Sequence, residues 1–123
     1  MYGRKRTMNT IPILRMYDVD KTKEFYLNFL DFSLNWEHRF EEAFPLYMQI
    51  SLHDCRLHLS EHHGDCTSGS AVRIEIDDLT GYHQLLQEKH YTYANPGIEY
   101  PPWGGKELTV HDPAGNRLIF YEN

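Results

Sequence analysis

The sequence has few cysteines and no long apolar segment. Cys55 and Cys66 are the only two cysteines among 123 residues. Small secreted domains held together by disulfides have far more cysteine, so we expect both thiols to be reduced. No apolar run approaches the ~20 residues that cross a bilayer, and no apolar stretch follows the basic cluster at residues 4–6. The sequence therefore predicts a cytoplasmic protein with no membrane partner.

Positive charge is also scarce. Twelve Lys and Arg residues face eighteen Asp and Glu residues, which gives a net charge of -6. This balance disfavours a nucleic-acid partner and favours a cationic small molecule. The sequence has no Gly-x-Ser-x-Gly nucleophile motif, phosphate loop or dinucleotide-binding fingerprint. Aromatic residues, in contrast, make up 14% of the chain, and so high a share needs an explanation.

The first half of the chain has a βαβββ pattern. An apolar strand is predicted at residues 10–17, and Asp18 and Asp20 follow it as candidate helix caps. Residues 21–30 carry apolar side chains at helical spacing, which predicts an amphipathic helix. Alternating segments then predict three strands, at residues 32–37, 44–51 and 56–61.

The second half repeats this pattern after a segment rich in turn-forming residues. A strand is predicted at residues 71–77 and a helix at 78–89, and three further strands at 91–100, 106–111 and 117–122. We therefore expect one domain over residues 1–123, with module one at about 10–61, a linker at 62–70 and module two at 71–122. Two half-barrels should join edge to edge, because one curved sheet cannot cover its own apolar face.

Three segments resemble a known family. They are Arg56-Leu-His-Leu-Ser-Glu-His62, Ala71-Val-Arg-Ile-Glu-Ile-Asp-Asp78, and the run from Pro102 to Phe120 that contains Asp-Pro-Ala-Gly-Asn. The chain is similar from Ile11 to Glu122 to bleomycin-resistance proteins of the glyoxalase/bleomycin-resistance (vicinal oxygen chelate) superfamily. The resemblance implies an α+β fold in which two βαβββ modules form a curved mixed sheet with a ligand crevice. A shared fold does not by itself imply a shared function.

Enzymes of this superfamily place one metal ligand on each of four strands. The matching positions in this sequence are Ile11, His58, Ala71 and Ile119. Only His58 could be a ligand, and one imidazole cannot hold a catalytic divalent ion. The resemblance therefore implies no metal and no cofactor, and it argues against catalysis. Two alternatives stay open: a non-standard metal site around His58, Glu61 and Glu107, and catalysis without metal.

Other histidines offer a weaker metal signal. His62 and His63 are adjacent at a strand end, so their side chains point to different sides, and we favour a solvated loop. His58 lies between Leu57 and Leu59 and should face the opposite way, into the crevice. It could bind a ligand there or pair with a neighbouring Glu.

Strand alternation predicts which side chains line the crevice. Trp103 lies in a Pro-Pro-Trp-Gly-Gly loop at the expected crevice mouth, where stacking on a planar ligand or a partner subunit is favoured over loop packing. Each carboxylate in the set could instead be a surface group paired with Arg56, Arg73 or Lys106. The candidate ligand-binding residues are Trp36, Tyr47, Gln49, His58, Glu61, Arg73, Glu75, Trp103, Glu107, Thr109, His111 and Tyr121.

The resemblance implies a function in resistance. Bleomycin-like antibiotics are elongated, cationic and end in flat heteroaromatic rings, which aromatic walls and carboxylates would hold. Such a protein sequesters the drug without changing it. The family implies a homodimer, and Pro12 resembles the hinge proline before an exchanged first strand. The alternatives are an enzyme of the same superfamily acting on a small metabolite, and a binding module for an unrelated metabolite.

Overall fold

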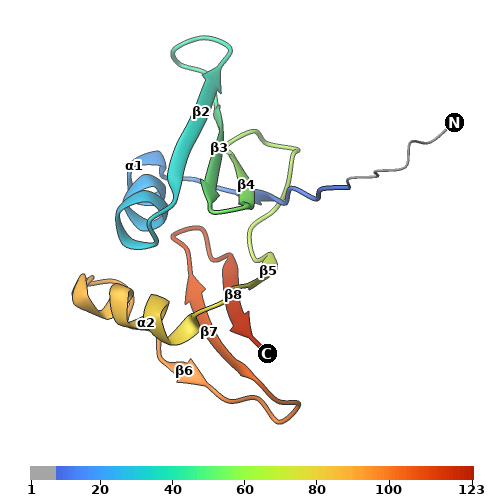
Figure 1. Cartoon of the computed structure of the whole chain (residues 1–123). Coiled ribbons are helices and arrows are strands. Elements are labelled where there is room, and N and C mark those ends of the chain that lie inside the picture. The colour runs from blue at the N-terminus through green and yellow to red at the C-terminus, as the bar shows by residue number, and fades with distance from the viewer. Residues whose placement is uncertain (1–7) are drawn as a thin grey trace, which may run out of the picture.

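The computed structural model describes residues 8–123, so the basic cluster at residues 4–6 lies outside the described part of the chain. Two four-stranded sheets each have a helix packed on one face, and in Figure 1 both helices lie to the left of their sheets. The predicted α+β class is confirmed, and neither sheet closes into a barrel. Within residues 8–123, no helix is long and apolar enough to cross a membrane.

The first sheet has the strand order β1-β4-β3-β2. Strand β1 is parallel to β4, and the other neighbours are antiparallel. The elements of this half are β1 (Ile13–Arg15), α1 (Val19–Lys23), the π-helical segment η1 (Glu24–Phe29), β2 (Ser33–Arg39), β3 (Leu46–Leu52) and β4 (Cys55–Ser60).

The second sheet repeats this topology with the order β5-β8-β7-β6. Strand β5 is parallel to β8, as β1 is to β4, and the remaining pairs are antiparallel. The predicted internal repeat is therefore present in the strand connections. Its elements are β5 (Ala71–Glu75), α2 (Leu79–Glu88), β6 (Ile98–Glu99), β7 (Lys106–His111) and β8 (Arg117–Glu122).

Both helical segments begin at an aspartate. The Asp18 side chain accepts a 3.0 Å hydrogen bond from the Lys21 amide, and the Asp78 side chain accepts a 2.9 Å bond from the Gly81 amide. Each bond satisfies a backbone donor that the first turn of a helix leaves unpaired. The first helix then widens into η1, which buries three aromatic side chains: Phe25, Tyr26 and Phe29.

Two predicted strands are less than half as long as expected. The strand predicted at residues 91–100 was wrong over most of its length, because only Ile98–Glu99 pair with β7. Pro96 has no amide hydrogen to donate to a sheet, and Tyr91 instead stacks on Phe29 with ring centroids 4.6 Å apart. The opening strand contracts to Ile13–Arg15 and begins directly after Pro12.

The apolar core lies between the helices and the inner sheet faces. Within residues 8–123, nineteen hydrophobic residues are buried there, and they come from both halves of the chain. Inward-facing Met48, Leu59, Leu108 and Phe120 show the alternation that the sequence predicted. Because the helices cover only these inner faces, the outer faces of both sheets stay open in the described chain. The candidate site residues lie mainly on those outer faces.

Candidate functional site

The outer face of the first sheet carries Tyr47, Gln49 and His58. Their neighbours in sequence, Met48 and Leu57, are fully buried on the inner face. Gln49 and His58 are directly opposite each other in the β3–β4 ladder. Strand alternation therefore places these polar and aromatic side chains side by side, as the sequence predicted.

A β-bulge brings two consecutive residues of β2 to the same outer face. The register between β2 and β3 shifts between Leu34 and Trp36, which leaves Asn35 as the extra residue. Asn35 contacts Gln49 and Ser51, while the Trp36 ring stacks on Tyr47. In a regular strand these two side chains would point to opposite faces. The bulge therefore sets an amide beside an indole.

Three rings form what we call the aromatic cluster: Trp36, Tyr47 and His58. Trp36 and Tyr47 are nearly parallel, with centroids 6.0 Å apart and an interplanar angle of 12°. His58 meets both rings edge-on, at 5.3 Å from Trp36 and 5.1 Å from Tyr47. Trp36 remains 43% exposed. The cluster thus offers a preformed aromatic surface to a ligand.

Both ring nitrogens of His58 are held by protein side chains. Nδ1 lies 2.6 Å from the Tyr47 hydroxyl, and Nε2 lies 3.0 Å from Oε1 of Gln49. The amide oxygen of Gln49 only accepts, so Nε2 carries the proton. Burial, and then the charge of Arg56, lower the pKa of His58, which favours the neutral ring. Nδ1 therefore accepts from Tyr47. The sequence left open a pairing with Glu, but the partners are Tyr and Gln.

A polar groove lies beside the aromatic cluster. Its volume is about 540 Å³. Gln49 belongs both to this lining and to the contacts of His58, so the groove and the cluster adjoin. The side chains that line the groove include Asn35, Gln49, Ser51, His53, Asp54 and Arg56.

The residues present do not fit a catalytic metal ion. Of the four family positions, Ile11, Ala71 and Ile119 have no ligating atom in the side chain, and His58 has both nitrogens engaged. Among residues 8–123, no three His, Cys, Asp or Glu side chains come together in a group that could hold a metal. A divalent ion needs several convergent donors, which this face lacks.

The outer face of the second sheet carries a separate charged group. The Arg73 guanidinium lies over the Tyr121 ring at 4.4 Å and contacts Glu107 at 3.2 Å. Glu75 accepts a bond from Asn123, and His111 is exposed at the end of β7. Glu107 thus has the Arg73 partner that the sequence offered as its alternative. Among the described contacts, no hydrogen bond or ion pair joins this group to the aromatic cluster.

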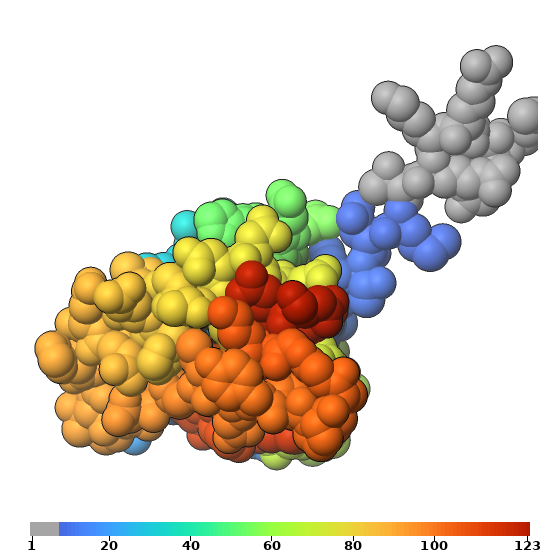
Figure 2. All heavy atoms as spheres, turned by 60° about the horizontal axis from the view of Figure 1, so that its bottom comes forward, coloured from blue at the N-terminus to red at the C-terminus, as the bar shows by residue number. Residues whose placement is uncertain are grey.

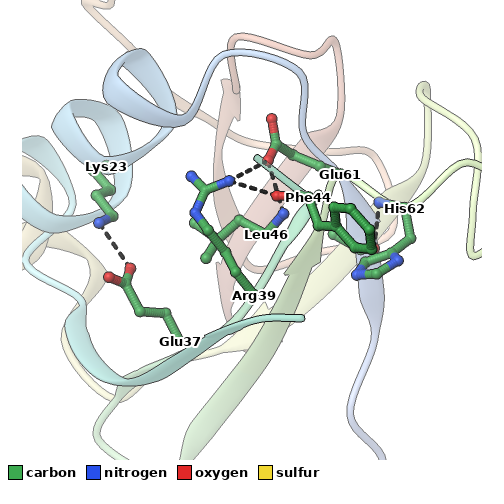
Figure 3. A network of polar contacts seen from close by, with 8 residues as sticks. Lys23, Glu37, Arg39, Phe44, Leu46, Glu61 and His62 are labelled. Carbon is green, nitrogen blue, oxygen red and sulfur yellow. Dashed lines mark hydrogen bonds and ion pairs between the residues drawn. The ribbon is translucent and has the colours of Figure 1, made fainter. Parts of the chain in front are cut away.

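Glu61 has a different set of contacts from those that the sequence suggested. Its Oε1 accepts a 2.8 Å bond from the Leu46 amide and lies 3.8 Å from the Arg39 guanidinium, as Figure 3 shows. Arg39 also donates to the Phe44 carbonyl at 2.7 Å. These bonds connect the β2–β3 hairpin to the end of β4. Glu61 therefore anchors the start of β3, and its partner Arg39 is none of the three cations (Arg56, Arg73 and Lys106) that the sequence offered.

Trp103 belongs to the second half of the chain, whereas the aromatic cluster lies on the first sheet. It lies in the loop between β6 and β7, 74% exposed, whereas the β2–β3 loop is at the opposite end of the molecule (Figure 1). Figure 2 shows the orange segment that contains the Trp103 loop on the front surface, near the C-terminal strand. The structure therefore does not bring Trp103 together with Trp36, although the sequence suggested a common crevice.

Sequence reasoning named only Gln49 among the residues that line the polar groove, and it missed Asn35, Ser51 and Arg56 among others. Ser51 and Arg56 are opposite each other in the β3–β4 ladder, so the strand pattern could have placed both on the outer face. No local signal marked Asn35, because the bulge that turns it outward is a feature of the pairing between β2 and β3.

Comparison with known proteins gives a family and a set of similar structures. A family model described as a glyoxalase superfamily protein matches residues 1–123. A bleomycin-binding protein solved in complex with bleomycin is 25% identical, with a TM-score of 0.70, covering 95% of this chain and 99% of that one. A search of curated proteins gives no match.

Two further structures share the fold at lower identity. The bleomycin-binding protein of bleomycin-producing Streptomyces verticillus, solved with copper(II)-bleomycin, is 24% identical, with a TM-score of 0.69 and coverage of 97% of this chain and 98% of that one. A lactoylglutathione lyase from Agrobacterium tumefaciens is 14% identical, with a TM-score of 0.71 and coverage of 97% and 96%. Because binding proteins and a lyase have this fold in common, the fold alone does not decide between binding and catalysis.

Proposed function

The chain belongs to the glyoxalase superfamily, and we propose that it binds a cationic aromatic small molecule of the bleomycin class and sequesters it without catalysis. The aromatic cluster carries this proposal. Its rings are already stacked against one another, and Trp36 has nearly half of its surface free to contact a ligand. A preformed aromatic surface binds a flat ring with little loss of side-chain entropy.

The charge of the chain supports a cationic ligand. The net charge is -6, and Glu75 is an exposed carboxylate on the open face of the second sheet. Exposed aromatic rings also attract cations through their faces. The bleomycin-binding protein that is 25% identical to this chain was solved with bleomycin. Because bleomycin-like antibiotics are cationic and carry flat aromatic rings, this similarity further supports a ligand of the bleomycin class.

The contacts of His58 support binding without catalysis. A general base needs a free lone pair on the atom that takes the proton. In His58, Nδ1 accepts from Tyr47 and Nε2 donates to Gln49, so neither nitrogen is free to accept a proton or bind a metal. His58 is thus part of the frame that holds Tyr47.

We further propose a two-fold homodimer as the binding form. Ile13, Leu34 and Trp36 expose apolar surface on the first half of the chain, and Trp103 does so on the second. A partner related by two-fold symmetry would set the second sheet and Trp103 of one copy opposite the first sheet of the other. This arrangement would unite the two groups of predicted site residues that one chain keeps apart.

Isothermal titration with copper-loaded bleomycin tests the function. We expect binding at one or two sites per dimer, with quenching of tryptophan fluorescence, and light scattering should give the mass of two chains. The Trp36→Ala variant should bind at least tenfold more weakly, which corresponds to about 1.4 kcal/mol. Absence of both heat and quenching with the native protein would overturn the proposal for this drug class.

A further inference from the structure

A continuous series of hydrogen bonds crosses the outer face of the first sheet. It begins at the Tyr47 hydroxyl and passes through His58 to Gln49. Gln49 Nε2 then donates to Oδ1 of Asn35 at 3.1 Å, and Asn35 Nδ2 donates to Oγ of Ser51 at 3.0 Å. Five side chains from three strands are thus linked, and the series leads from the aromatic cluster into the polar groove.

Every bond in this series has the same direction. The Gln49 oxygen accepts from His58, so the nitrogen of the same amide is the group that donates to Asn35. Asn35 repeats this pattern, with its oxygen accepting and its nitrogen donating. The neutral His58 ring accepts from Tyr47 at one nitrogen and donates to Gln49 at the other. Bonds aligned in this way polarise and strengthen one another.

The direction of the series defines the chemistry at its end. Ser51 Oγ accepts from Asn35, so the Ser51 hydrogen remains to be donated to another group. Ser51 lines the polar groove, and Arg56 lies opposite it on β4 as a second donor. Two donors at this end of the groove favour a ligand group that accepts hydrogen bonds.

The charges around the groove favour an uncharged group. Arg56 and Asp54 both line it, so an anion would face the carboxylate and a cation would face the guanidinium. The remaining lining is largely amide and hydroxyl. Sugar hydroxyls and peptide amides have this chemistry, because both donate and accept without carrying charge.

We propose that the polar groove is a second subsite, which takes a hydroxyl- or amide-rich group joined directly to the ring that stacks on Trp36. This inference rests on the proposed function, because it needs a ring on the aromatic cluster. Trp36 pairs with Gln49 across the β2–β3 ladder, and Ser51 is two residues farther along β3. Two residues of a strand span roughly 7 Å, which is about the length of one sugar with its hydroxyls or of two peptide units.

Probes that share one ring test the subsite. 4-Nitroanisole carries the ring alone, 4-nitrophenyl glycosides add a sugar, and 4-nitrophenylacetyl-glycinamide adds two amides. Nitrophenyl groups quench indole fluorescence, so a titration followed by Trp36 emission in a Trp103→Phe background reports ring binding. Amide shifts of Asn35, Ser51 and Arg56 in nuclear magnetic resonance spectra report occupation of the groove. Comparison of the glycosides with the glycinamide shows whether the groove prefers a sugar or a peptide-like group.

We expect at least one extended probe to bind fivefold or more tightly than 4-nitroanisole and to shift the groove amides. Ser51→Ala should abolish this advantage of the extended probe, and Ser68→Ala, in an exposed loop, should preserve it. Equal affinity for all probes, with quenching of Trp36, would overturn the subsite but keep the aromatic site. Absence of quenching with every probe would overturn the subsite, whereas the proposed function is overturned only if the native protein also fails to bind copper-loaded bleomycin.

Discussion

The hydroxyl of Tyr26 donates a 2.7 Å hydrogen bond to Oδ2 of Asp112, a residue 86 positions away in the sequence. Asp112 begins the Asp-Pro-Ala-Gly-Asn turn, and its Oδ1 accepts from the amides of Ala114 and Asn116. The Asn116 side chain in turn donates to the Arg15 carbonyl at 2.9 Å. The turn before β8 thus joins the second half of the chain to the first.

Replacing Tyr26 by Phe removes one donor from this junction. Asp112 is only 6% exposed, so water cannot replace the lost bond. We expect Tyr26→Phe to lower the free energy of unfolding by about 1–3 kcal/mol in urea denaturation. Tyr93→Phe, at an 81% exposed position, is the matched control and should stay within about 0.5 kcal/mol of the native protein. Equal stabilities of the two variants would contradict this role for Tyr26.

Stability should fall in alkaline solution because folded tyrosines resist ionisation. Burial, and next the Asp112 carboxylate, raise the pKa of Tyr26, and burial with a bond to Glu24 raises the pKa of Tyr91 to about 12. A raised folded-state pKa stabilises the protein fully below the unfolded pKa of about 10, and this stabilisation is lost as pH rises above it.

The Tyr26→Phe variant has no hydroxyl at position 26 to ionise, so it lacks the pH-dependent stabilisation that Tyr26 contributes. The free energy of unfolding of the native protein should therefore fall more steeply than that of the variant between about pH 9 and pH 11. The stability difference between the two proteins should narrow over the same range, as followed by urea denaturation at each pH. A difference that stays constant would show that Tyr26 ionises equally in both states.

Gly105 precedes β7 in a conformation that other residues rarely adopt. Its φ is +73°, and a Cβ atom there would lie 2.7 Å from the Glu122 carbonyl oxygen. The positive φ and the close contact with Glu122 both disfavour a side chain at this position, so Gly105→Ala should destabilise the fold by more than about 1 kcal/mol. Gly97→Ala is the control, because a Cβ atom there meets nothing within 4 Å. Similar melting temperatures for the two variants would argue against the close contact.

The surroundings of His58 predict both the pKa and the tautomer of its ring. Its folded-state pKa is lowered below about 6.5, so its contribution to stability is present above that pH and is lost as pH falls through the folded value. Nitrogen chemical shifts should show the tautomer protonated at Nε2. Arg56→Gln should move the pKa upward, because Arg56 disfavours the charged ring. A tautomer protonated at Nδ1 would contradict the assigned direction of the bonds.

The two tryptophans should differ in their dependence on assembly. If a partner chain brings Trp103 to the ligand, Trp103→Ala should weaken copper-bleomycin binding by more than ~1 kcal/mol only under conditions where the protein is dimeric. Trp36→Ala should weaken binding in either state. Titration calorimetry at protein concentrations above and below the dimer dissociation constant separates these cases. An unchanged affinity of Trp103→Ala in the dimer would assign Trp103 to loop packing.

The strand pattern predicted much of the arrangement of the first sheet. The alternation of Leu57, His58 and Leu59 predicted that the imidazole lies on the open face of the sheet. The same alternation on the neighbouring strand predicted this face for Tyr47. The cap at Asp18 was also a local feature, as was the start of the second helix at residue 78. These predictions succeeded because side-chain direction and helix capping depend on a few consecutive residues.

Long-range pairing decided what the sequence could not. The strand predicted through Pro96 failed because Tyr91 packs on Phe29 from the first half of the chain. Glu61 lies among residues brought near by the β2–β3 hairpin, so its bonds to Leu46 and Arg39 had no signal in its own strand.

The sequence by itself determined the repeated modules and the inward and outward faces of the strands, because both follow from local periodicity. Only the tertiary structure decided that Asn35 turns to the same face as Trp36 and that the two nitrogens of His58 are held by Tyr47 and Gln49. Both depend on the register between strands, which is set by the packing of the whole sheet.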